Sequence, residues 1–308
     1  LSESEIYTFD RAGRLLSAYD GHSHFWRGLS GAAVEKFTDS HRGKQVRPLD
    51  LAQADRLVRA AQQRLNAFDG RCPEPALCDR IRRYDPAADR ETFAGAYGKV
   101  AILPADQYMS LVLQLAAGCS WNRCTFCYFY RDQKYRVRTG EEFRQHIRAV
   151  QRFLGESQLL RRAIFLGDAD ILSVGQATLI EAMRAATGTF PGRPFYGFCE
   201  AAFAAGKTPA ELASLKQAGL RRLYIGAESG HDPLLAHFAK RSRRAHLVEA
   251  VGKLKRAGLQ VGLIFLVGVP QTFQSDHVRD TVTLLAELPL GAGDLVYLSP
   301  LLPSPNDP

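Results

Sequence analysis

Three cysteines, Cys119, Cys124 and Cys127, lie close together in one short stretch of this 308-residue chain. Three thiolates in one loop can hold three corners of a [4Fe–4S] cube, which leaves the fourth iron open to a ligand from outside the protein. A structural zinc site takes four protein ligands. No fourth Cys or His lies nearby in the sequence, since the next such residue is His146. The spacing therefore favours an iron–sulfur cluster over zinc.

The elements that must position these cysteines follow from a regular pattern that begins near Val100. Short apolar runs predict buried strands at Leu111–Leu115, Ala163–Gly167, Phe195–Cys199, Arg222–Gly226, Leu259–Leu266 and Leu295–Leu298. Amphipathic stretches between them predict helices at Glu141–Leu154, Ala177–Ala186, Pro209–Ala218, Ala245–Ala257 and Ser275–Leu288. Alternating strands and helices predict βαβ units with a parallel sheet. The strands are too few for a closed TIM barrel, so we expect an α/β fold with a partial (β/α)6 barrel, and its site at the carboxyl ends of the strands.

Acidic and basic residues follow several of these strands. A carboxylate at a strand end can pair with an ammonium group of a ligand. Asp170 could instead cap the next helix, and Glu200 and Glu228 could be ordinary loop acids. Lys240 lies in a run with three arginines and could be solvated.

The stretch from Cys119 to Cys127 resembles the signature of the radical S-adenosylmethionine (radical SAM) superfamily, C-x3-C-x-φ-C, with Phe126 at the aromatic position. This chain has a C-x4-C-x2-C variant, because four residues separate Cys119 from Cys124. The resemblance covers about residues 100–300. It implies a [4Fe–4S] cluster whose open iron chelates SAM, and a one-electron cleavage that yields a 5′-deoxyadenosyl radical.

The resemblance also implies roles for residues at the strand ends. Gly167–Asp170 would bind the methionine amino group, and Lys240 the methionine carboxylate. Ile225–Gly230 is similar to a segment of the branch that includes methylthiotransferases, cobalamin-dependent members and oxygen-independent coproporphyrinogen oxidase-like proteins. The cofactor-binding residues so implied are Phe126, Tyr128, Gly167, Asp168, Asp170, Glu200, Glu228, Ser229, Lys240 and Val267.

The sequence leaves the reaction open. A single-cluster enzyme that abstracts hydrogen from a small substrate is our main interpretation, with Tyr128 and Cys199 as catalytic candidates and Tyr130, Tyr297 and Ser299 also facing the barrel lumen. A lone buried cysteine such as Cys199 usually behaves as a small hydrophobe. One alternative is an RNA-modifying enzyme (methyl or methylthio transfer), with Arg131–Arg138 and Lys240–Arg244 as the binding face. Another is a non-catalytic cluster or haem carrier.

Residues 1–98 read as an N-terminal extension of unknown role, followed by a barrel core from 99 to 308 whose C-terminus we expect to be incomplete. A helix is predicted at Asp50–Phe68. The extension holds Cys72 and Cys78 in a proline-rich connector. Two thiolates alone rarely hold a cluster, but the sequence leaves open whether this pair binds a second metal site. The chain has six cysteines, three of them clustered, and this distribution indicates metal or redox chemistry in the cytoplasm rather than a disulfide framework.

Composition constrains the partners only weakly. The net charge of +8 suits an anionic substrate or RNA, but an excess of this size is usually an ordinary solvated surface. No apolar run reaches the roughly 20 residues that a membrane span needs. We expect a small-molecule substrate, an electron donor such as flavodoxin or ferredoxin, and no membrane.

Overall fold

The computed structural model describes residues 5–68, 70 and 72–302, and it divides into two compact units. One unit comprises Leu1–Gly98 with Arg148–Leu160, and the other comprises Lys99–Ile147 with Arg161–Pro308. We retain the division into an N-terminal extension and a barrel core as a proposal, with Arg148–Leu160 added to the first unit.

The barrel unit contains a six-stranded sheet in which every strand is parallel to its neighbours. Its spatial order, β6-β9-β10-β11-β12-β13, follows the order of the strands along the chain. The bounds are β6 (Leu111–Gln114), β9 (Ile164–Gly167), β10 (Phe195–Cys199), β11 (Leu220–Glu228), β12 (Gln260–Val267) and β13 (Leu295–Pro300). All six predicted strands are present. The two end strands do not pair with each other among the described residues, so the barrel is partial as expected.

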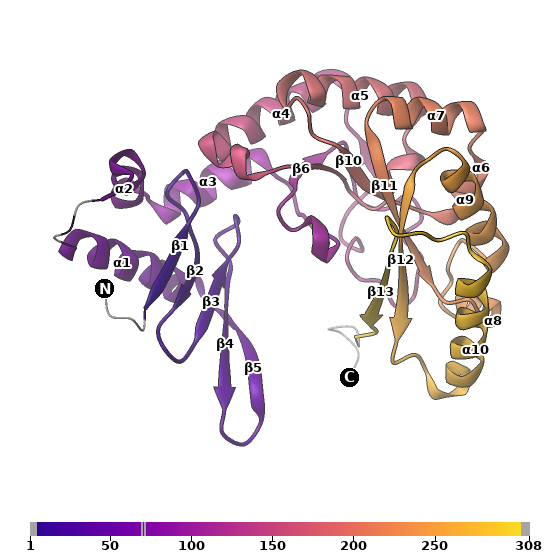
Figure 1. Ribbon diagram of the computed structural model, residues 1–308, viewed down its shortest axis with the longest axis horizontal. Helices are drawn as coiled ribbons and strands as arrows, with labels where there is room; N and C mark the ends of the chain where they lie inside the picture. The colour runs from indigo at the N-terminus through magenta and orange to yellow at the C-terminus, as the bar shows by residue number, and fades with distance from the viewer. Residues whose placement is uncertain (1–4, 69, 71, 303–308) are drawn as a thin grey trace. The chain divides into compact units, whose positions relative to one another are not determined.

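Helices connect successive strands and lie on the outer side of the curved sheet (Figure 1). They are α4 (Gly140–Leu154), α5 (Gln176–Thr189), α6 (Ala201–Gly206), α7 (Pro209–Gln217), α8 (Asp232–His237), α9 (Arg244–Arg256) and α10 (Gln271–Glu287). The five predicted helices are confirmed. The pattern missed α6 and α8, because six residues are too short to show a helical period.

Aromatic side chains fill the interior of the barrel. Phe165, Tyr196, Phe198 and Tyr224 form one buried cluster, and Tyr297 of β13 packs against it. The hydroxyl groups of Tyr224 and Tyr297 donate to Asp106 at 2.6 and 2.5 Å. Although burial acts in the opposite direction, these hydrogen bonds lower the pKa of Asp106. Tyr297 is therefore engaged with Asp106 and does not line the site described below, contrary to our expectation.

The first unit has an antiparallel sheet whose strands follow chain order. It consists of β1 (Ile6–Phe9), β2 (Leu15–Tyr19), β3 (His24–Arg27), β4 (Ala33–Asp39) and β5 (Gly43–Leu49), with helices α1 (Leu51–Ala67), α2 (Pro75–Arg83) and α3 (Pro86–Ala96). The helix predicted at Asp50–Phe68 is confirmed as α1, and Asp50 caps it in a capping box with Gln53.

Buried Arg14 connects parts of this first unit. Its guanidinium pairs with Asp10 at 3.3 Å and with Asp89 at 2.9 Å, and it lies 4.2 Å from the ring centre of Phe153. The side chain is 5% exposed, so its charge is compensated almost wholly by protein groups.

Cys72 and Cys78 of the same unit form a disulfide bond. We did not predict this bond, because we interpreted the cysteines as metal or redox residues rather than as a disulfide framework. A single pair of cysteines in a loop does not by itself indicate a disulfide, so the pairing could not be predicted from the sequence. Paired with each other, the two sulfurs are not available as ligands of a second metal site in this structure.

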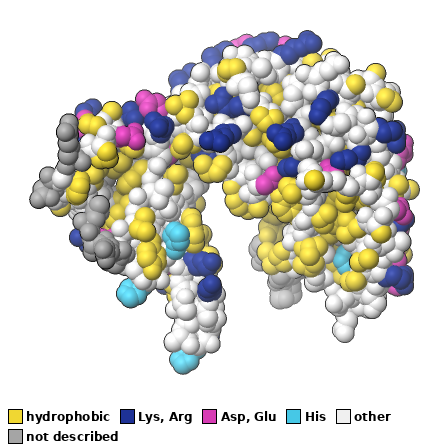
Figure 2. Space-filling view, viewed as in Figure 1, with side chains coloured by type: hydrophobic (Ala, Val, Ile, Leu, Met, Phe, Trp, Pro, Cys, Tyr) yellow, Lys and Arg dark blue, Asp and Glu magenta, His cyan; other side chains and the backbone are white. Residues whose placement is uncertain are grey.

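The exterior of the molecule shows two further features. On β13, Val296 and Leu298 are exposed, and Figure 2 shows hydrophobic side chains gathered over this part of the barrel unit. No helix in the described part of the chain is long and apolar enough to cross a membrane.

Gly230 pins the end of β11 against α10. Its N–H donates to Thr281 Oγ1 at 2.9 Å, and a Cβ on it would lie 2.8 Å from Thr281 Cα and 2.7 Å from the carbonyl carbon of Asp280. Backbone atoms cannot move aside cheaply. We therefore predict that Gly230→Ala lowers the free energy of unfolding by about 2 kcal/mol or more, measured by urea denaturation.

Gly188→Ala is the matched control, because a Cβ at this exposed position of α5 would meet no other atom within 4 Å. It should keep or slightly raise stability, by about 0.5–1 kcal/mol. Equal stability of the two variants would show that the packing of Gly230 against α10 is not tight.

Candidate active site

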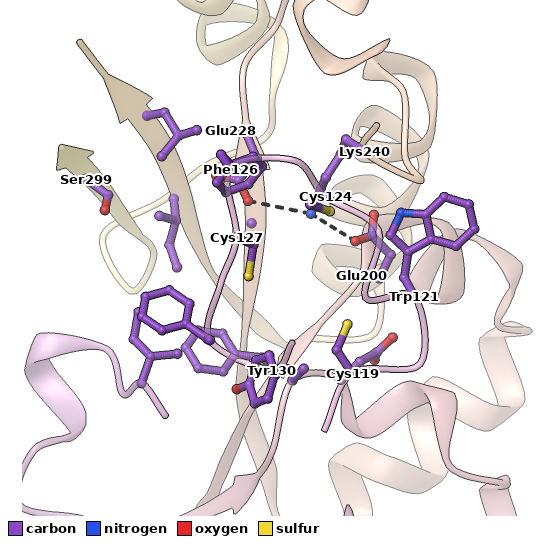
Figure 3. A pocket seen from close by; sticks show the side chains of 18 of the residues that line it. Cys119, Trp121, Cys124, Phe126, Cys127, Tyr130, Glu200, Glu228, Lys240 and Ser299 are labelled. Carbon is purple, nitrogen blue, oxygen red and sulfur yellow. Dashed lines mark ion pairs between the residues drawn. The ribbon is translucent and has the colours of Figure 1, made fainter. Parts of the chain in front are cut away.

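A cavity of about 310 Å³ opens at the carboxyl ends of the barrel strands. The loop that carries Cys119, Cys124 and Cys127 forms one wall, and residues that end β10, β11, β12 and β13 form the others (Figure 3). The location that we predicted for the site therefore coincides with this cavity.

The cysteine loop leaves and rejoins the barrel at a short antiparallel pair, β7 (Ala116–Ala117) with β8 (Arg136–Val137). Within the loop, the N–H of Asn122 donates to Cys119 Sγ at 3.3 Å, and Asn122 adopts a positive φ of 47°. Asparagine is one of the few residues that adopts this conformation at low cost. The turn that it makes lies between the first two cysteines of the motif.

The segment after α8 holds the loop from the other side. The N–H of Thr125 donates to the carbonyl of Phe238 at 3.0 Å, and Trp121 Nε1 donates to the carbonyl of Ala239 at 2.9 Å. These bonds hold the backbone of the cysteine loop against the part of the chain that leads to Lys240.

The cysteine thiols are half-buried and free. Burial raises the pKa of Cys124 to about 12, and it also raises the pKa of Cys127. Thiols of this kind lose their protons when a cationic metal centre binds, since the metal charge compensates the thiolate. Among the described residues, no three Cys, His, Asp or Glu side chains converge on one ion. Thiolates of a cubane each bind a different iron, so the ligands of a cluster need not converge in this way.

Lys240 lies between two carboxylates at the back of the cavity. Its Nζ is 2.9 Å from Glu200 Oε2 and 3.5 Å from Glu228 Oε1, as the dashed lines of Figure 3 show. The Lys240 side chain is only 9% exposed. Burial opposes its charge, but the two glutamates outweigh it and raise the pKa of Lys240. Lys240 is therefore not part of a solvated basic run.

The ends of β10 and β11 bring the two glutamates together. Glu200 follows the last residue of β10, and Glu228 ends β11 with a φ of 60° at an irregularity in its pairing with β12. Gly226 makes room for this arrangement, because a Cβ there would collide with the Glu228 carboxylate. Burial raises the pKa of Glu228, and Lys240 acts against that rise.

Two carboxylate oxygens of residues that line the cavity, Asp170 Oδ2 and Glu200 Oε1, are buried without a hydrogen-bond partner. The other oxygen of Asp170 accepts from Leu172 N at 2.9 Å, so this residue also caps the short helical turn that follows β9. Burial raises the pKa of Asp170 to about 7. Buried acceptors normally have donors. A ligand with an ammonium group or several N–H groups would supply them.

Three predicted cofactor-binding residues near β9 and β11 lie away from the cavity wall. Gly167 ends β9, and Asp168 Oδ2 accepts from the N–H of Gly118 at 3.3 Å. Burial raises the pKa of Asp168 to about 6. Ser229 Oγ lies 2.8 Å from Nδ1 of buried His277. Asp168 thus supports the start of the cysteine loop, and Ser229 fastens β11 to α10.

On β12, Ile264 and Leu266 line the cavity, whereas the predicted Val267 does not and is 38% exposed. Leu266 lies one residue before Val267, and Ile264 lies three residues before it. The strand was therefore predicted correctly, but the side of the strand that faces the cavity was not. The remaining predicted residues that line the cavity are Phe126, Tyr128, Tyr130, Cys199 and Ser299. Burial raises the pKa of the Cys199 thiol well above its ordinary value.

The structure adds residues to the cavity wall that the sequence did not indicate. Trp121 lies near two guanidinium groups, 5.1 Å from that of Arg123 and 5.2 Å from that of Arg241. The other additions are mainly apolar: Ile102, Phe129, Phe198, Leu301 and Leu302. Trp121 could have been found from its place inside the cysteine motif. The others come together only through the fold.

Solved structures similar to this chain share little sequence with it. The cobalamin-dependent S-adenosylmethionine radical enzyme OxsB with aqua-cobalamin bound has 14% identity and a TM-score of 0.47, over 84% of this chain and 33% of that one. Methylornithine synthase (PylB) has 16% identity and a TM-score of 0.48, over 82% and 69%. Coproporphyrinogen III oxidase (HemN) from Escherichia coli has 14% identity and a TM-score of 0.48, over 70% and 48%. This chain therefore spans about a third of the length of OxsB. No curated protein sequence matches it.

The model of the family described as the radical SAM superfamily matches residues 113–285, which is more than half of the chain. The matched segment runs from within β6 to within α10 and contains the cysteine loop, Glu200, Glu228 and Lys240. Members of this family are enzymes that use a [4Fe–4S] cluster and SAM. The chain belongs to the radical SAM superfamily.

Proposed function

We propose that this chain cleaves SAM reductively at a single [4Fe–4S] cluster held by Cys119, Cys124 and Cys127, and abstracts hydrogen from a small substrate. One observation carries the proposal. Three free thiols and two unpartnered buried carboxylate oxygens border the same cavity. The thiols are the donor set of a cluster with one open iron, and the carboxylates suit a cationic ligand.

The cluster and SAM, when bound, supply one electron and a scissile carbon–sulfur bond, which together give methionine and a 5′-deoxyadenosyl radical. The residues of the chain bind and orient. Asp170 would accept hydrogen bonds from the methionine amino group. Glu200 and Glu228 would contact the ribose hydroxyls or the methionine moiety, each held in place by Lys240.

Apolar residues would hold the rest of the cofactor and limit access of water. Phe126, Ile264 and Leu266 offer a surface for a purine face, and Tyr128 could present its backbone to the adenine. Cys199 and Tyr128 remain candidates for a hydrogen donor. Lys240 already forms ion pairs with Glu200 and Glu228. If it also bound the methionine carboxylate of SAM, as the resemblance implies, that carboxylate would be the third anion beside it.

The geometry gives the RNA alternative little support. In the two basic runs, Arg136 pairs with Glu142 and Arg244 pairs with Glu287, while Lys240 lines the cavity and pairs with Glu200. Figure 2 shows Lys and Arg side chains spread over the visible face of the barrel unit rather than gathered in one field. A nucleic-acid interface concentrates positive charge along one surface.

The same proposal includes a one-electron donor of the flavodoxin or ferredoxin class as partner and a cytoplasmic location, because an exposed, reduced cluster survives best in a reducing compartment. Consumption of SAM distinguishes the proposed enzyme from a cluster or haem carrier of the same fold, since a carrier would not consume SAM.

The test is anaerobic reconstitution with iron and sulfide, followed by dithionite and SAM, with 5′-deoxyadenosine and methionine measured by mass spectrometry. The wild type should bind about four irons and release both products, because three thiolates and an open iron suffice for cleavage. Cys124→Ala should lose both. The matched control is Cys72→Ser/Cys78→Ser, which removes the other cysteine pair and should keep iron content and cleavage. Stoichiometric zinc, or intact SAM with a loaded cluster, would contradict the proposal.

Asp170 gives a pH-dependent prediction. Its pKa is raised to about 7, and only the ionised carboxylate attracts an ammonium group. The affinity of the loaded protein for SAM should therefore rise as the pH increases from about 6 to 8. Asp170→Asn should lose this rise and bind SAM about 5–100-fold more weakly at pH 8, since one charge-assisted hydrogen bond is lost.

Asp168→Asn is the control, since Asp168 also has a raised pKa but faces Gly118 rather than the cavity. Its SAM affinity should follow the wild-type pH profile in equilibrium dialysis. Loss of the pH dependence in Asp168→Asn but not in Asp170→Asn would reverse the two assignments.

A further inference from the structure

Arg131 is an exposed residue whose guanidinium is folded back onto the cysteine loop. Its Nε donates to the carbonyl oxygen of Cys127 at 2.9 Å. Its Nη2 donates to the carbonyl oxygen of Cys124 at 2.9 Å and reaches that of Thr125 at 3.4 Å. One side chain therefore connects the peptide groups of two of the three candidate ligand residues.

Arginine is suited to this arrangement because its guanidinium is a rigid, planar fork of several donors. Three carbonyl groups that converge on one cation are held at fixed mutual positions. The cysteine loop has few internal backbone bonds of its own, among them Cys127 N to Cys124 O at 3.2 Å. The guanidinium thus restrains the segment from Cys124 to Cys127 at the side where the chain turns away toward β8.

The charge of Arg131 is not matched by a carboxylate. Among the described residues it forms no ion pair, and its neighbour Asp132 pairs with Lys99 at 2.9 Å. A positive charge beside the ligand residues favours the more negative state of a bound cluster, because net charge and hydrogen bonds around a cluster set its reduction potential.

We propose that Arg131 is a positioning residue of the cluster loop, which fixes the Cys124–Cys127 segment through its carbonyl contacts and eases reduction of the cluster through its charge. The inference rests on the proposed function, in that these cysteines hold the cluster. It assigns Arg131 to the site rather than to the basic run Arg131–Arg138 that we considered for RNA. The reduction itself takes one electron from an external one-electron reductant, which is dithionite in the test below.

Three variants of the full chain separate the contact from the charge. Arg131→Lys keeps the charge but cannot reach three carbonyls with one fork. Arg131→Gln removes the charge. Lys134→Gln is the matched control, because it removes a charge from an exposed residue of the same segment whose side chain forms no hydrogen bond or ion pair among the described residues.

The contact is tested in the cluster-free protein by anaerobic alkylation with iodoacetamide, with Cys124 and Cys127 followed by peptide mass spectrometry. Arg131→Lys should be alkylated about three- to tenfold faster than the wild type, since the loop opens more often without its restraint. The retained charge keeps the thiol pKa values nearly constant, so the rate reports loop opening. Lys134→Gln should react at the wild-type rate.

The charge is tested in the reconstituted protein by redox titration with dithionite, followed by electron paramagnetic resonance. At a fixed applied potential, Arg131→Gln should have a reduced-to-oxidised ratio about three- to tenfold lower than the wild type. The larger value corresponds to a midpoint lowered by about 59 mV for a one-electron couple. Lys134→Gln should stay close to the wild type, because among the described residues no hydrogen bond holds its ammonium against the peptide groups of Cys124 and Cys127, as Arg131 is held.

Wild-type alkylation rates in Arg131→Lys and a wild-type midpoint in Arg131→Gln would overturn the inference. An equal midpoint shift in Lys134→Gln would also overturn it, since any nearby charge would then suffice. If Arg131→Gln does not fold, the alkylation of Arg131→Lys decides. A wild-type protein that binds no cluster would contradict the proposed function, whereas the alkylation experiment would still decide whether Arg131 restrains the loop.

Discussion

The buried lysine between two glutamates is the interaction on which the arrangement of this site depends. Lys240 compensates Glu200 and Glu228, which come from the ends of neighbouring strands β10 and β11. Without the lysine, two carboxylates would face each other beside three cysteines with no positive charge between them. Removing one partner of a buried ion pair is costly for the same reason. The segment that carries Lys240 also holds the cysteine loop, through Phe238 and Ala239.

This coupling explains how an open sheet can build a defined cavity. The cysteine loop is anchored at its neck by β7 and β8, along one side by the segment after α8, and at its exit by Arg131. The carboxylates are anchored by strand ends and by Lys240. The unpartnered oxygens of Asp170 and Glu200 leave the wall short of donors. SAM carries both a sulfonium and an ammonium group, and its positive charges match a wall of this kind.

Sequence alone predicts the parts of the fold that show a periodic pattern of apolar residues or a recognisable motif. The strands β6 and β9–β13 and the helices between them follow from apolar periodicity, and the cysteine loop follows from its spacing. The burial of Lys240 does not, because a lysine next to three arginines looks like a solvated run. The prediction of Val267 as a cavity residue was wrong by one position along β12. Neighbouring residues of a strand face opposite sides, so Leu266 lines the cavity and Val267 does not. The sheet β1–β5 and the Cys72–Cys78 bond leave weak signals, as short polar strands and a single pair of cysteines resemble loops.

The central claim is that the open iron of a cluster held by Cys119, Cys124 and Cys127 binds the amino and carboxylate groups of SAM in this cavity. Electron–nuclear double resonance on the reduced protein, mixed with SAM labelled with ¹⁵N at the amino group, tests this contact directly. The account predicts a ¹⁵N coupling to the cluster that disappears when unlabelled SAM replaces the labelled compound. A cluster signal that SAM leaves unchanged, with no nitrogen coupling, would contradict it.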